Sequence, residues 1–274
     1  MTMRLPLAPP NPARELAFCV LVGWAVFIAI PLALGGIGLG WDALNHHVYL
    51  GWVAESPRFD RDLNAAQNQA YQYPYLYWPM YRLVEAGVSG RVAGVILDSL
   101  YVPLLPALWI VARVLVPGRD WEAVAMRLLA VVLAFLSGVV LAHFDSTGND
   151  LLAAVPFVWS VALALLPWDA QRPAWLTERR LMVLSGVAAG CAVACKLSNG
   201  PIALVLPIAW AWAGTGGLRV RLANVLWAGT ATIVVFLLLY GYWGWQLWVH
   251  FGNPVYPMYD GRFAPLRQWL GMPG

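Results

Sequence analysis

Long apolar runs, with charged residues gathered mainly at their ends, are the dominant feature of this sequence. Seven runs can be counted, at about 16–40, 91–116, 122–143, 150–167, 181–198, 200–214 and 222–247. A helix needs about 20 largely apolar residues to cross a bilayer, where every backbone polar group must be paired within the spanning structure. The runs therefore predict an all-α, polytopic transmembrane bundle of about seven helices, forming one domain over residues 1–274.

The composition supports a lipid environment. Hydrophobic residues make up 61% of the chain and charged residues 11%, whereas soluble domains carry about 25% charged residues. The formal net charge is +3, and the basic residues are spread over several loops instead of forming a dense cluster. This distribution argues against a nucleic-acid partner and favours the lipid bilayer.

The arginines predict the orientation of the bundle, because arginine and lysine near helix ends favour the cytoplasmic side. Those in alternate segments between the runs are Arg4, Arg14, Arg113, Arg119, Arg127, Arg172, Arg179, Arg180, Arg219 and Arg221. The N-terminus is therefore expected to be cytoplasmic. The 41–90 loop, the C-terminal segment 248–274 and the turns near 145 and 198 are expected to face outside.

The 41–90 loop is the largest segment outside the apolar runs. It contains paired histidines, several amide side chains and the aromatic run YQYPYLYWPMY. Aromatic rings of this kind suit the headgroup level of a membrane. We expect two short helices, at about 43–56 and 75–88, lying on the membrane surface and joined by a polar stretch.

Asp42 directly follows the first apolar run and is the first candidate for catalysis. A carboxylate held at the membrane surface suits a general base, which takes a proton from a reacting group. The structural alternative is that Asp42 caps the amphipathic helix that follows, with its side-chain oxygen accepting backbone N–H bonds. The sequence leaves both interpretations open.

His46 and His47 are candidates for binding substrate. Adjacent side chains on a helix point about 100° apart, so the pair is not expected to form a two-histidine metal site. One histidine can approach Asp42 or a substrate while the other faces headgroups. The alternative is that both are interfacial histidines with no role in chemistry.

Lys196 is the only lysine in the chain, and it lies at the outer end of the fifth run, where the arginine pattern gives it no reason to be. A lysine ammonium is a compact donor for phosphate. Ser198, Asn199 and Gly200 follow and lead into Pro201, at the start of the sixth run. The free backbone N–H groups at the start of that helix can contribute to an anion site. The alternative is a cation that snorkels to a lipid headgroup.

The turn HFDSTGND adds polar residues on the same expected side, among them Asp145, Asn149 and Asp150. Asn149 or Asp150 can cap the next helix, which explains one acidic group but not both. Asp98 differs, because it lies well inside the second run. Burying an acidic group inside a membrane helix costs free energy, so such a group is a candidate functional residue. A buried hydrogen bond to a neighbouring helix is the alternative for Asp98.

Four segments give the chain a resemblance to a bacterial member of the C-type membrane glycosyltransferases (the GT-C superfamily), which use polyprenyl-phosphate sugars. They are WDALNHHVYLGWVAESPRFDRDLNAAQNQAYQYPYLYWPMYRL, STGND, CKLSNGP and FGNPVYPMYDGRF. The resemblance implies a seven-helix module in the bacterial inner membrane with its site outside. It also implies an inverting sugar transfer in which the lipid phosphate leaves.

By this resemblance, Asp42 matches the acidic residue that acts as the base in the first outer loop. Lys196 would contact the donor phosphate, and Asn149 with Asp150 would line the cleft. The remaining members of the expected substrate-binding set are His46, His47, Asp145 and Asn253. No cofactor is expected, and the need for a divalent metal stays open because no residue pattern supports one.

Two other readings are compatible with the sequence. Asp98 and the Gly–Pro breaks suit a polytopic transporter, although the two halves show no matching breaks. The chain also ends at Gly274, whereas members of the superfamily usually continue with further helices. A fragment, or a non-catalytic truncated copy, is therefore the third reading.

Overall fold

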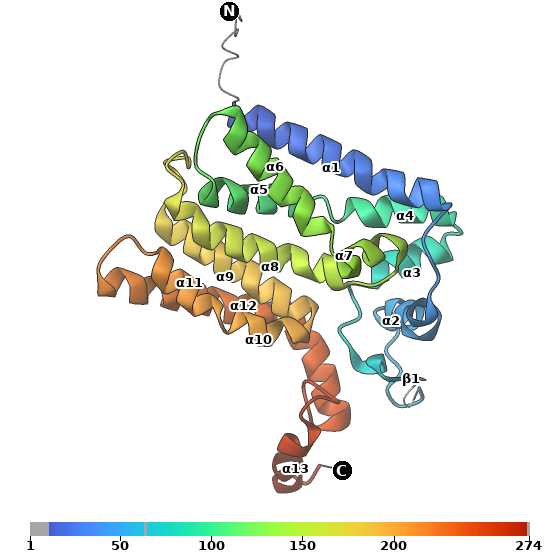
Figure 1. Cartoon of the computed structure of the whole chain (residues 1–274). Helices are drawn as coiled ribbons and strands as arrows, with labels where there is room; N and C mark the ends of the chain where they lie inside the picture. Colours follow the sequence, from blue (N-terminus) through green and yellow to red (C-terminus); the bar gives the residue numbers. More distant parts are fainter. Residues whose placement is uncertain (1–10, 63–64, 273–274) are drawn as a thin grey trace, which may run out of the picture.

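The computed structural model describes residues 11–62 and 65–272, so Arg4 lies outside the described residues. The described residues are mainly helical. The helices of the bundle are α1 (Pro12–Leu34), α4 (Gly90–Ser99), α5 (Leu104–Leu115), α6 (Trp121–Phe135), α7 (Gly138–Ala142), α8 (Asp150–Leu165), α9 (Glu178–Cys195), α10 (Gly200–Ala203), α11 (Leu206–Ala213) and α12 (Leu218–Phe251). Figure 1 shows α1 at the top, α8 and α9 in the middle, and α11 and α12 below.

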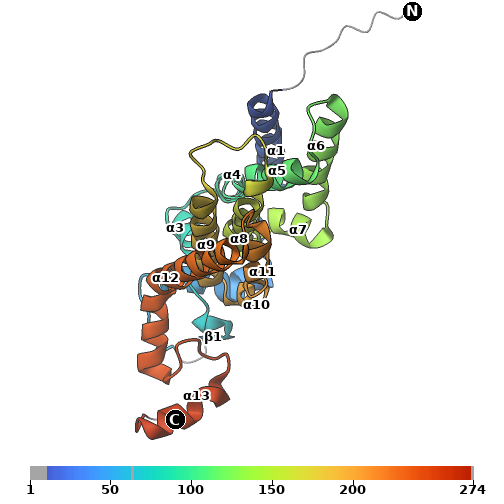
Figure 2. The same cartoon turned by 90° about the vertical axis from the view of Figure 1, so that its left-hand side faces the viewer.

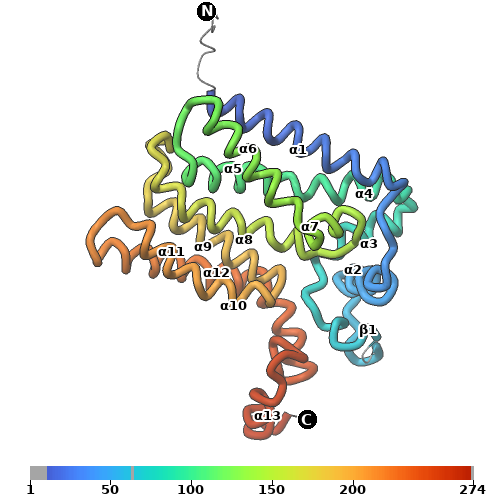
Figure 3. Tube along the Cα trace, in the orientation of Figure 1, coloured from blue at the N-terminus to red at the C-terminus, as the bar shows by residue number. Residues whose placement is uncertain are grey.

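The 41–90 segment forms a small subregion beside the bundle. It contains a π-helical turn (Ala43–His47), α2 (Val48–Val53), the short strand β1 (Ala65–Asn68) and α3 (Trp78–Glu85). In the trace of Figure 3 the chain leaves α1 on the right, passes through these elements and returns as α4. Helices are thus present within both expected ranges, and their position on a membrane surface stays a prediction.

Among the described residues, four segments are long and apolar enough to cross a membrane: Pro12–Leu34, Gly90–Leu115, Asp150–Trp168 and Leu218–Phe251. A fifth is obtained if α6 and the Gly138–Asp145 segment, bent by 64°, are one span. These segments are compatible with an integral membrane protein. The expected bundle of seven spans is not confirmed.

The fifth and sixth runs account for the difference between the seven expected spans and the five, at most, among the described residues. Helix α9 begins with the charged residues Glu178, Arg179 and Arg180 and ends at Cys195, so its apolar part, 181–195, is shorter than the expected run 181–198. The sixth run is divided into α10 and α11. At 1.5 Å per residue, the 14 residues from Gly200 to Ala213 reach roughly 21 Å, which is less than the ~30 Å hydrocarbon core.

The helices share two ends. At one end, here called the arginine end, α1, α6, α9 and α12 begin and α5, α8 and α11 finish. Nine arginines belong to this end: Arg14, Arg113, Arg119, Arg127, Arg172, Arg179, Arg180, Arg219 and Arg221. At the other, the site end, α1 and α9 finish and α4 and α8 begin. These nine arginines therefore lie at the opposite end from Asp42, Asp150 and Lys196, as the run order predicts. Arg58, Arg61, Arg82 and Arg91 belong to the 41–90 segment and the first turn of α4, at the site end.

A buried ion pair joins three helices at the arginine end. Arg127 of α6 donates two hydrogen bonds of 2.7 Å to the Glu15 carboxylate of α1, and Trp109 Nε1 of α5 donates a third, also 2.7 Å. Arg127 also donates to the carbonyl oxygens of Val116 and Gly118. The two buried charges thus satisfy each other, which offsets part of their large desolvation cost. In Figure 2, α1 and α6 stand together at this part of the bundle.

The most extensive helix contact is between α9 and α12. A Cβ placed on Gly186 would lie 2.1 Å from the Ala228 carbonyl oxygen, and one on Gly190 would lie 2.5 Å from that of Thr232. Thr232 Oγ1 also donates to the Gly186 carbonyl oxygen at 3.0 Å. Small residues four apart let two backbones approach closely, which is how helices pack in a lipid environment.

Serine and tryptophan side chains connect α9 to its other neighbours. Ser185 Oγ of α9 donates to the Ser160 carbonyl oxygen of α8 at 2.7 Å and accepts from Trp210 Nε1 of α11 at 2.8 Å. All three side chains are buried. Helix α9 is therefore the centre of the second half of the bundle.

We expect Gly186→Ala to destabilise the fold, because the added methyl group would meet the α12 backbone and force the two helices apart. Overpacking of this kind costs about 1–3 kcal/mol. Gly229→Ala is the matched control, since Gly229 lies in α12 with no atom within 4 Å of an added Cβ. Alanine there should stabilise by about 0.5–1 kcal/mol. Thermal unfolding in detergent micelles, followed by tryptophan fluorescence, measures the stability of both variants. Equal stability of Gly186→Ala and Gly229→Ala would contradict the close contact between α9 and α12.

Candidate functional site

Asp42 begins the π-helical turn that follows the extended 35–40 segment. Its side chain is 60% exposed and makes no capping hydrogen bond. His46 Nδ1 lies 3.8 Å from Asp42 Oδ1, too far for a hydrogen bond. The capping alternative is therefore wrong, and the carboxylate is accessible at the site end.

His46 and His47 are both buried, 4% and 5% exposed, so neither faces headgroups. His47 Nδ1 is hydrogen-bonded to Thr147 Oγ1 at 2.6 Å, and the His47 ring stacks on Tyr77 at 4.6 Å. His46 packs edge-on against His47, and its Nδ1 has no hydrogen-bond partner among residues 11–62 and 65–272. Irregular π-helical turns are frequent at functional sites.

Burial controls the charge of both histidines. It lowers the pKa of His47 to about 4, with nearby His46 as the second cause. Burial is also the main cause that lowers the pKa of His46, although Asp42 acts in the opposite direction. Both rings are therefore neutral at pH 7 and can exchange hydrogen bonds without adding positive charge.

The 146–150 turn connects the histidines to Lys196. Thr147 is hydrogen-bonded to His47. Asn149 and Asp150, in the same turn, contact Lys196. Lys196 Nζ lies 3.4 Å from Asn149 Oδ1 and forms an ion pair with Asp150. Asn149 makes no side-chain cap on α8, so its side-chain oxygen serves the lysine instead.

Lys196 directly follows α9 and has an extended backbone. Its side chain is 26% exposed, against 57% for Asp150. Asn199 fixes the turn after it, because its amide donates to the carbonyl oxygens of Ala153 in α8 and Ala192 in α9. The lysine is thus presented from a turn that is tied to two helices, with its positive charge compensated by Asp150.

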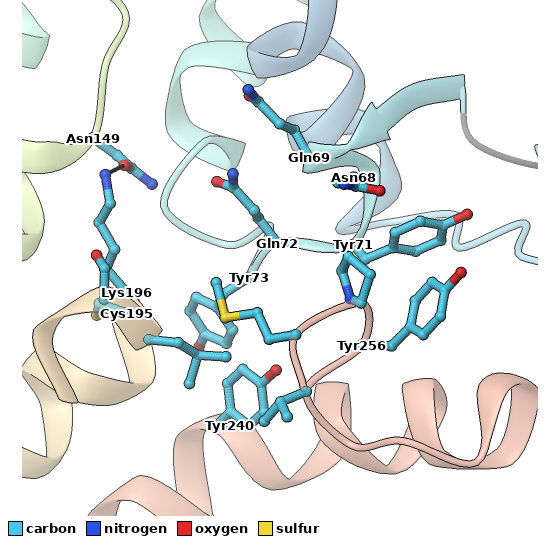
Figure 4. A pocket seen from close by; sticks show the side chains of 15 residues that line it. Asn68, Gln69, Tyr71, Gln72, Tyr73, Asn149, Cys195, Lys196, Tyr240 and Tyr256 are labelled. Carbon is cyan, nitrogen blue, oxygen red and sulfur yellow. Dashed lines mark hydrogen bonds between the residues drawn. The ribbon is translucent and has the colours of Figure 1, made fainter. Parts of the chain in front are cut away.

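A cavity of about 410 Å³ lies at the site end, beside Lys196. Its lining combines amides, tyrosines and the lysine: Asn68, Gln69, Tyr71, Gln72, Tyr73, Asn149, Cys195, Lys196, Leu197, Ser198, Tyr240, Val255, Tyr256, Pro257 and Met258. Figure 4 shows Lys196 and Asn149 on one side, Gln69 and Gln72 across from them, and Tyr240 and Tyr256 on the α12 side. The lining carries a single charge, that of Lys196.

The cavity includes residues that the sequence analysis did not single out. Gln69, Gln72 and Asn68 belong to the amide-rich NAAQNQAYQY stretch, and Tyr240 lies far along the last apolar run. The amide enrichment was visible in the sequence, but a tyrosine in an apolar run carries no comparable signal. Trp243 of α12 donates to the Tyr71 carbonyl oxygen at 3.1 Å, which brings the two segments together.

Asp42 does not line this cavity. It is connected to it through His46, His47, the Thr147 hydrogen bond and Asn149. The structure therefore gathers six of the expected site residues in one region, namely Asp42, His46, His47, Asn149, Asp150 and Lys196. They form two neighbouring parts, an exposed carboxylate and a cationic cavity.

Asp145 and Asn253 have other surroundings. Asp145 packs against the 35–40 segment, where a Cβ on Gly38 would lie 2.7 Å from its Oδ1. Asn253 is fully buried; its amide donates to the Met258 carbonyl oxygen, and its side-chain oxygen accepts from Val255 N. Asn253 thus shapes the 253–258 loop, which contributes to the cavity wall, and its own side chain is not in the lining.

Asp98 of α4 is fully buried. Neither of its carboxylate oxygens has a hydrogen-bond partner within the described part of the chain. The buried hydrogen bond to a neighbouring helix, considered from the sequence, is therefore not made. Across the same residues, no group of three or more His, Cys, Asp or Glu side chains is arranged to hold a metal ion.

The site can accept an anion at Lys196, in exchange for Asp150, while the amides around it offer both donors and acceptors to a neutral polar ligand. Comparison of the chain with models of known protein families, with curated proteins and with solved structures gave no match.

Proposed function

We propose that this chain is a membrane glycosyltransferase that transfers a sugar from a polyprenyl-phosphate donor to an acceptor. The observation that carries the proposal is the 410 Å³ cavity, which contains the only lysine of the chain and lies at the site end, opposite the arginine end. A lone cation beside amides and aromatic rings suits a ligand that joins a phosphate to a neutral polar group. The resemblance of four sequence segments to the C-type superfamily supports the same function.

In this proposal Lys196 binds the donor phosphate. The lysine already has a carboxylate partner, so the phosphate must replace Asp150 at Nζ. The phosphodiester of the donor carries one negative charge, like the carboxylate. The phosphate monoester that leaves carries additional negative charge, which a compact ammonium stabilises. Asn149 remains beside Nζ as a neutral partner.

Asp42 is the proposed general base. The acceptor hydroxyl attacks the anomeric carbon of the sugar with inversion, and its proton passes to the Asp42 carboxylate. The bond between the anomeric carbon and the phosphate oxygen breaks, and its electron pair leaves with the lipid phosphate held at Lys196. The exposure of Asp42 and its lack of a structural hydrogen bond leave it free for this role.

The site end is proposed to face the outside of a bacterial inner membrane, with the N-terminus in the cytoplasm. The support is that nine of the described arginines gather at the arginine end, together with the preference of arginine for the cytoplasmic side. A lipid-linked sugar would then react outside the cell membrane, while its polyprenyl tail lies among the apolar helices.

A polytopic transporter is the second candidate, favoured by Asp98 alone. A fully buried acid without a partner inside an apolar helix is a typical feature of an ion or substrate pathway. The polar residues nevertheless gather at one end of the bundle, which favours surface chemistry.

We expect Lys196→Met to weaken the binding of undecaprenyl phosphate at least about tenfold, since a hydrogen bond to a charged group is lost. Asp150→Asn should bind as tightly as the parent or more so, because the competing carboxylate is removed. Native mass spectrometry of the full chain in detergent gives both affinities, and Lys196→Arg controls for charge. Unchanged affinity in a folded Lys196→Met protein would refute the phosphate role.

We expect Asp42→Asn to lower sugar transfer by about 10²–10⁴-fold, because the amide keeps the shape but cannot accept the proton. The readout is the polyprenyl-phosphate sugar that accumulates in cells lacking the gene, measured by mass spectrometry after complementation. Asp60→Asn, an exposed acid in the same loop (65% exposed side chain), is the matched control and should clear the lipid normally. If Asp42→Asn kept more than about a tenth of parental turnover, Asp42 would not be the general base.

The orientation predicts opposite labelling of two exposed arginines replaced by cysteine in a cysteine-free background. Arg61→Cys, in the 41–90 segment, should react with a membrane-impermeant maleimide in intact cells. Arg119→Cys, between α5 and α6, should react only after permeabilisation. The reverse pattern would overturn the assignment of the site end to the outside.

A further inference from the structure

A second cavity, of about 570 Å³, lies at the arginine end. The segment before α9 and the first turns of α9 form its wall: Trp175, Leu176, Thr177, Arg179, Arg180, Val183 and Leu184. We call it the Arg179–Arg180 cavity. It is separate from the Lys196 cavity, because the two lie at opposite ends of α9.

The two arginines of this cavity have no carboxylate partner among the described residues, unlike Arg127 and Arg113, which pair with Glu15 and Asp169. Arg180 Nη1 donates to the Trp175 carbonyl oxygen at 2.7 Å, and the Arg179 guanidinium stacks over the Trp227 ring at 4.0 Å. These contacts orient both guanidinium groups without neutralising them.

The nearest acid in the sequence, Glu178, is engaged elsewhere. Its carboxylate accepts hydrogen bonds from Thr215 Oγ1 at 2.8 Å and from Asn224 Nδ2 at 2.6 Å. Both partners lie on the α11–α12 side. The cavity therefore keeps two positive charges that call for an anion.

The remaining wall is apolar and exposed. Trp175 is 65% exposed and Leu184 43% exposed, and Val183 is half-buried. Val183 and Leu184 lie about one turn beyond the arginines along α9, which is the direction into the apolar part of the bundle. An exposed tryptophan at the start of an apolar helix suits the headgroup level of a bilayer.

We propose that the Arg179–Arg180 cavity binds one anionic phospholipid. The phosphate contacts the two guanidinium groups, Trp175 lies at the level of the glycerol backbone, and an acyl chain follows Val183 and Leu184. A guanidinium offers paired donors that match phosphate oxygens. Basic pockets at the ends of membrane helices are suited to anionic headgroups. Such a site is independent of sugar transfer and of Lys196.

The test is native mass spectrometry of the full chain in detergent, titrated with phosphatidylglycerol, phosphatidylcholine or glycerol 3-phosphate. The parent should prefer phosphatidylglycerol to phosphatidylcholine, and glycerol 3-phosphate, which lacks acyl chains, should not bind. The double variant Arg179→Gln/Arg180→Gln should bind phosphatidylglycerol about 30-fold more weakly, from about 1 kcal/mol for each arginine. Arg179→Lys/Arg180→Lys should keep most of the preference.

Arg219→Gln is the matched control, because Arg219 is an exposed arginine at the same end that does not line the cavity. It should leave phosphatidylglycerol binding unchanged. Equal affinity of the double glutamine variant and the parent would overturn the proposal. A loss in Arg219→Gln as large as in the double variant would also overturn it, since it would indicate a diffuse attraction by the arginine end. Circular dichroism verifies that each variant is folded.

Discussion

The close approach of α9 and α12 is the constraint on which the candidate site depends. Gly186 and Gly190 allow the α12 backbone to lie directly against α9. Lys196 is the residue after α9 ends, and Tyr240 lies on α12. The contact therefore brings a turn and a helix face together, and the Lys196 cavity forms between them. Side chains larger than glycine at these positions would separate two of its walls.

Helix α12 also holds the other parts of the cavity. Trp243 Nε1 donates to the Tyr71 carbonyl oxygen, which fixes the amide-rich 68–72 segment. Tyr240 OH donates to the Pro254 carbonyl oxygen at 3.2 Å, which fixes the loop that follows the helix. Helix α12 thus contacts three segments that are far apart in the sequence, namely the end of α9, the 68–72 segment and the 253–258 loop.

Charge is arranged differently at the two ends of the bundle. At the arginine end, Glu15 and Asp169 neutralise two arginines, and Arg179 and Arg180 are left with positive charge near an apolar wall. At the site end, one lysine is balanced by one aspartate, and the two histidines are neutral because they are buried. The first arrangement suits a lipid headgroup, and the second suits a ligand that can displace a single carboxylate.

Asp42 and Lys196 occupy neighbouring but different surroundings. The carboxylate is exposed and makes no capping hydrogen bond, whereas the lysine lies in a cavity and is held by Asn149 and Asp150. His46, His47 and Thr147 fill the space between them. This separation is consistent with a reaction in which one group handles a proton and the other a leaving phosphate.

The sequence by itself determined the helical, membrane-compatible character of the chain and the placement of nine arginines at the end opposite Asp42 and Lys196. Both follow from local hydrophobicity and from the alternation of helix direction, which need no knowledge of packing. The expected seven spans are not confirmed, because the sixth run forms two short helices, α10 and α11, with Pro201 and Pro207 in their first turns. The spacing of Gly186 and Gly190 was a readable sign of close helix packing, but it does not name the partner helix.

Only the tertiary structure decided which polar residues share a cavity. Gln69, Gln72, Tyr240 and Lys196 come from three distant segments, and no local pattern states that these segments meet. It also decided the roles of Asn253, which is buried within its loop, and of Asp42, which caps no helix. Hydrophobic patterning fixes which residues enter the membrane or the core, whereas the choice of neighbours depends on shape and hydrogen bonding between helices, which arise only when the chain is packed.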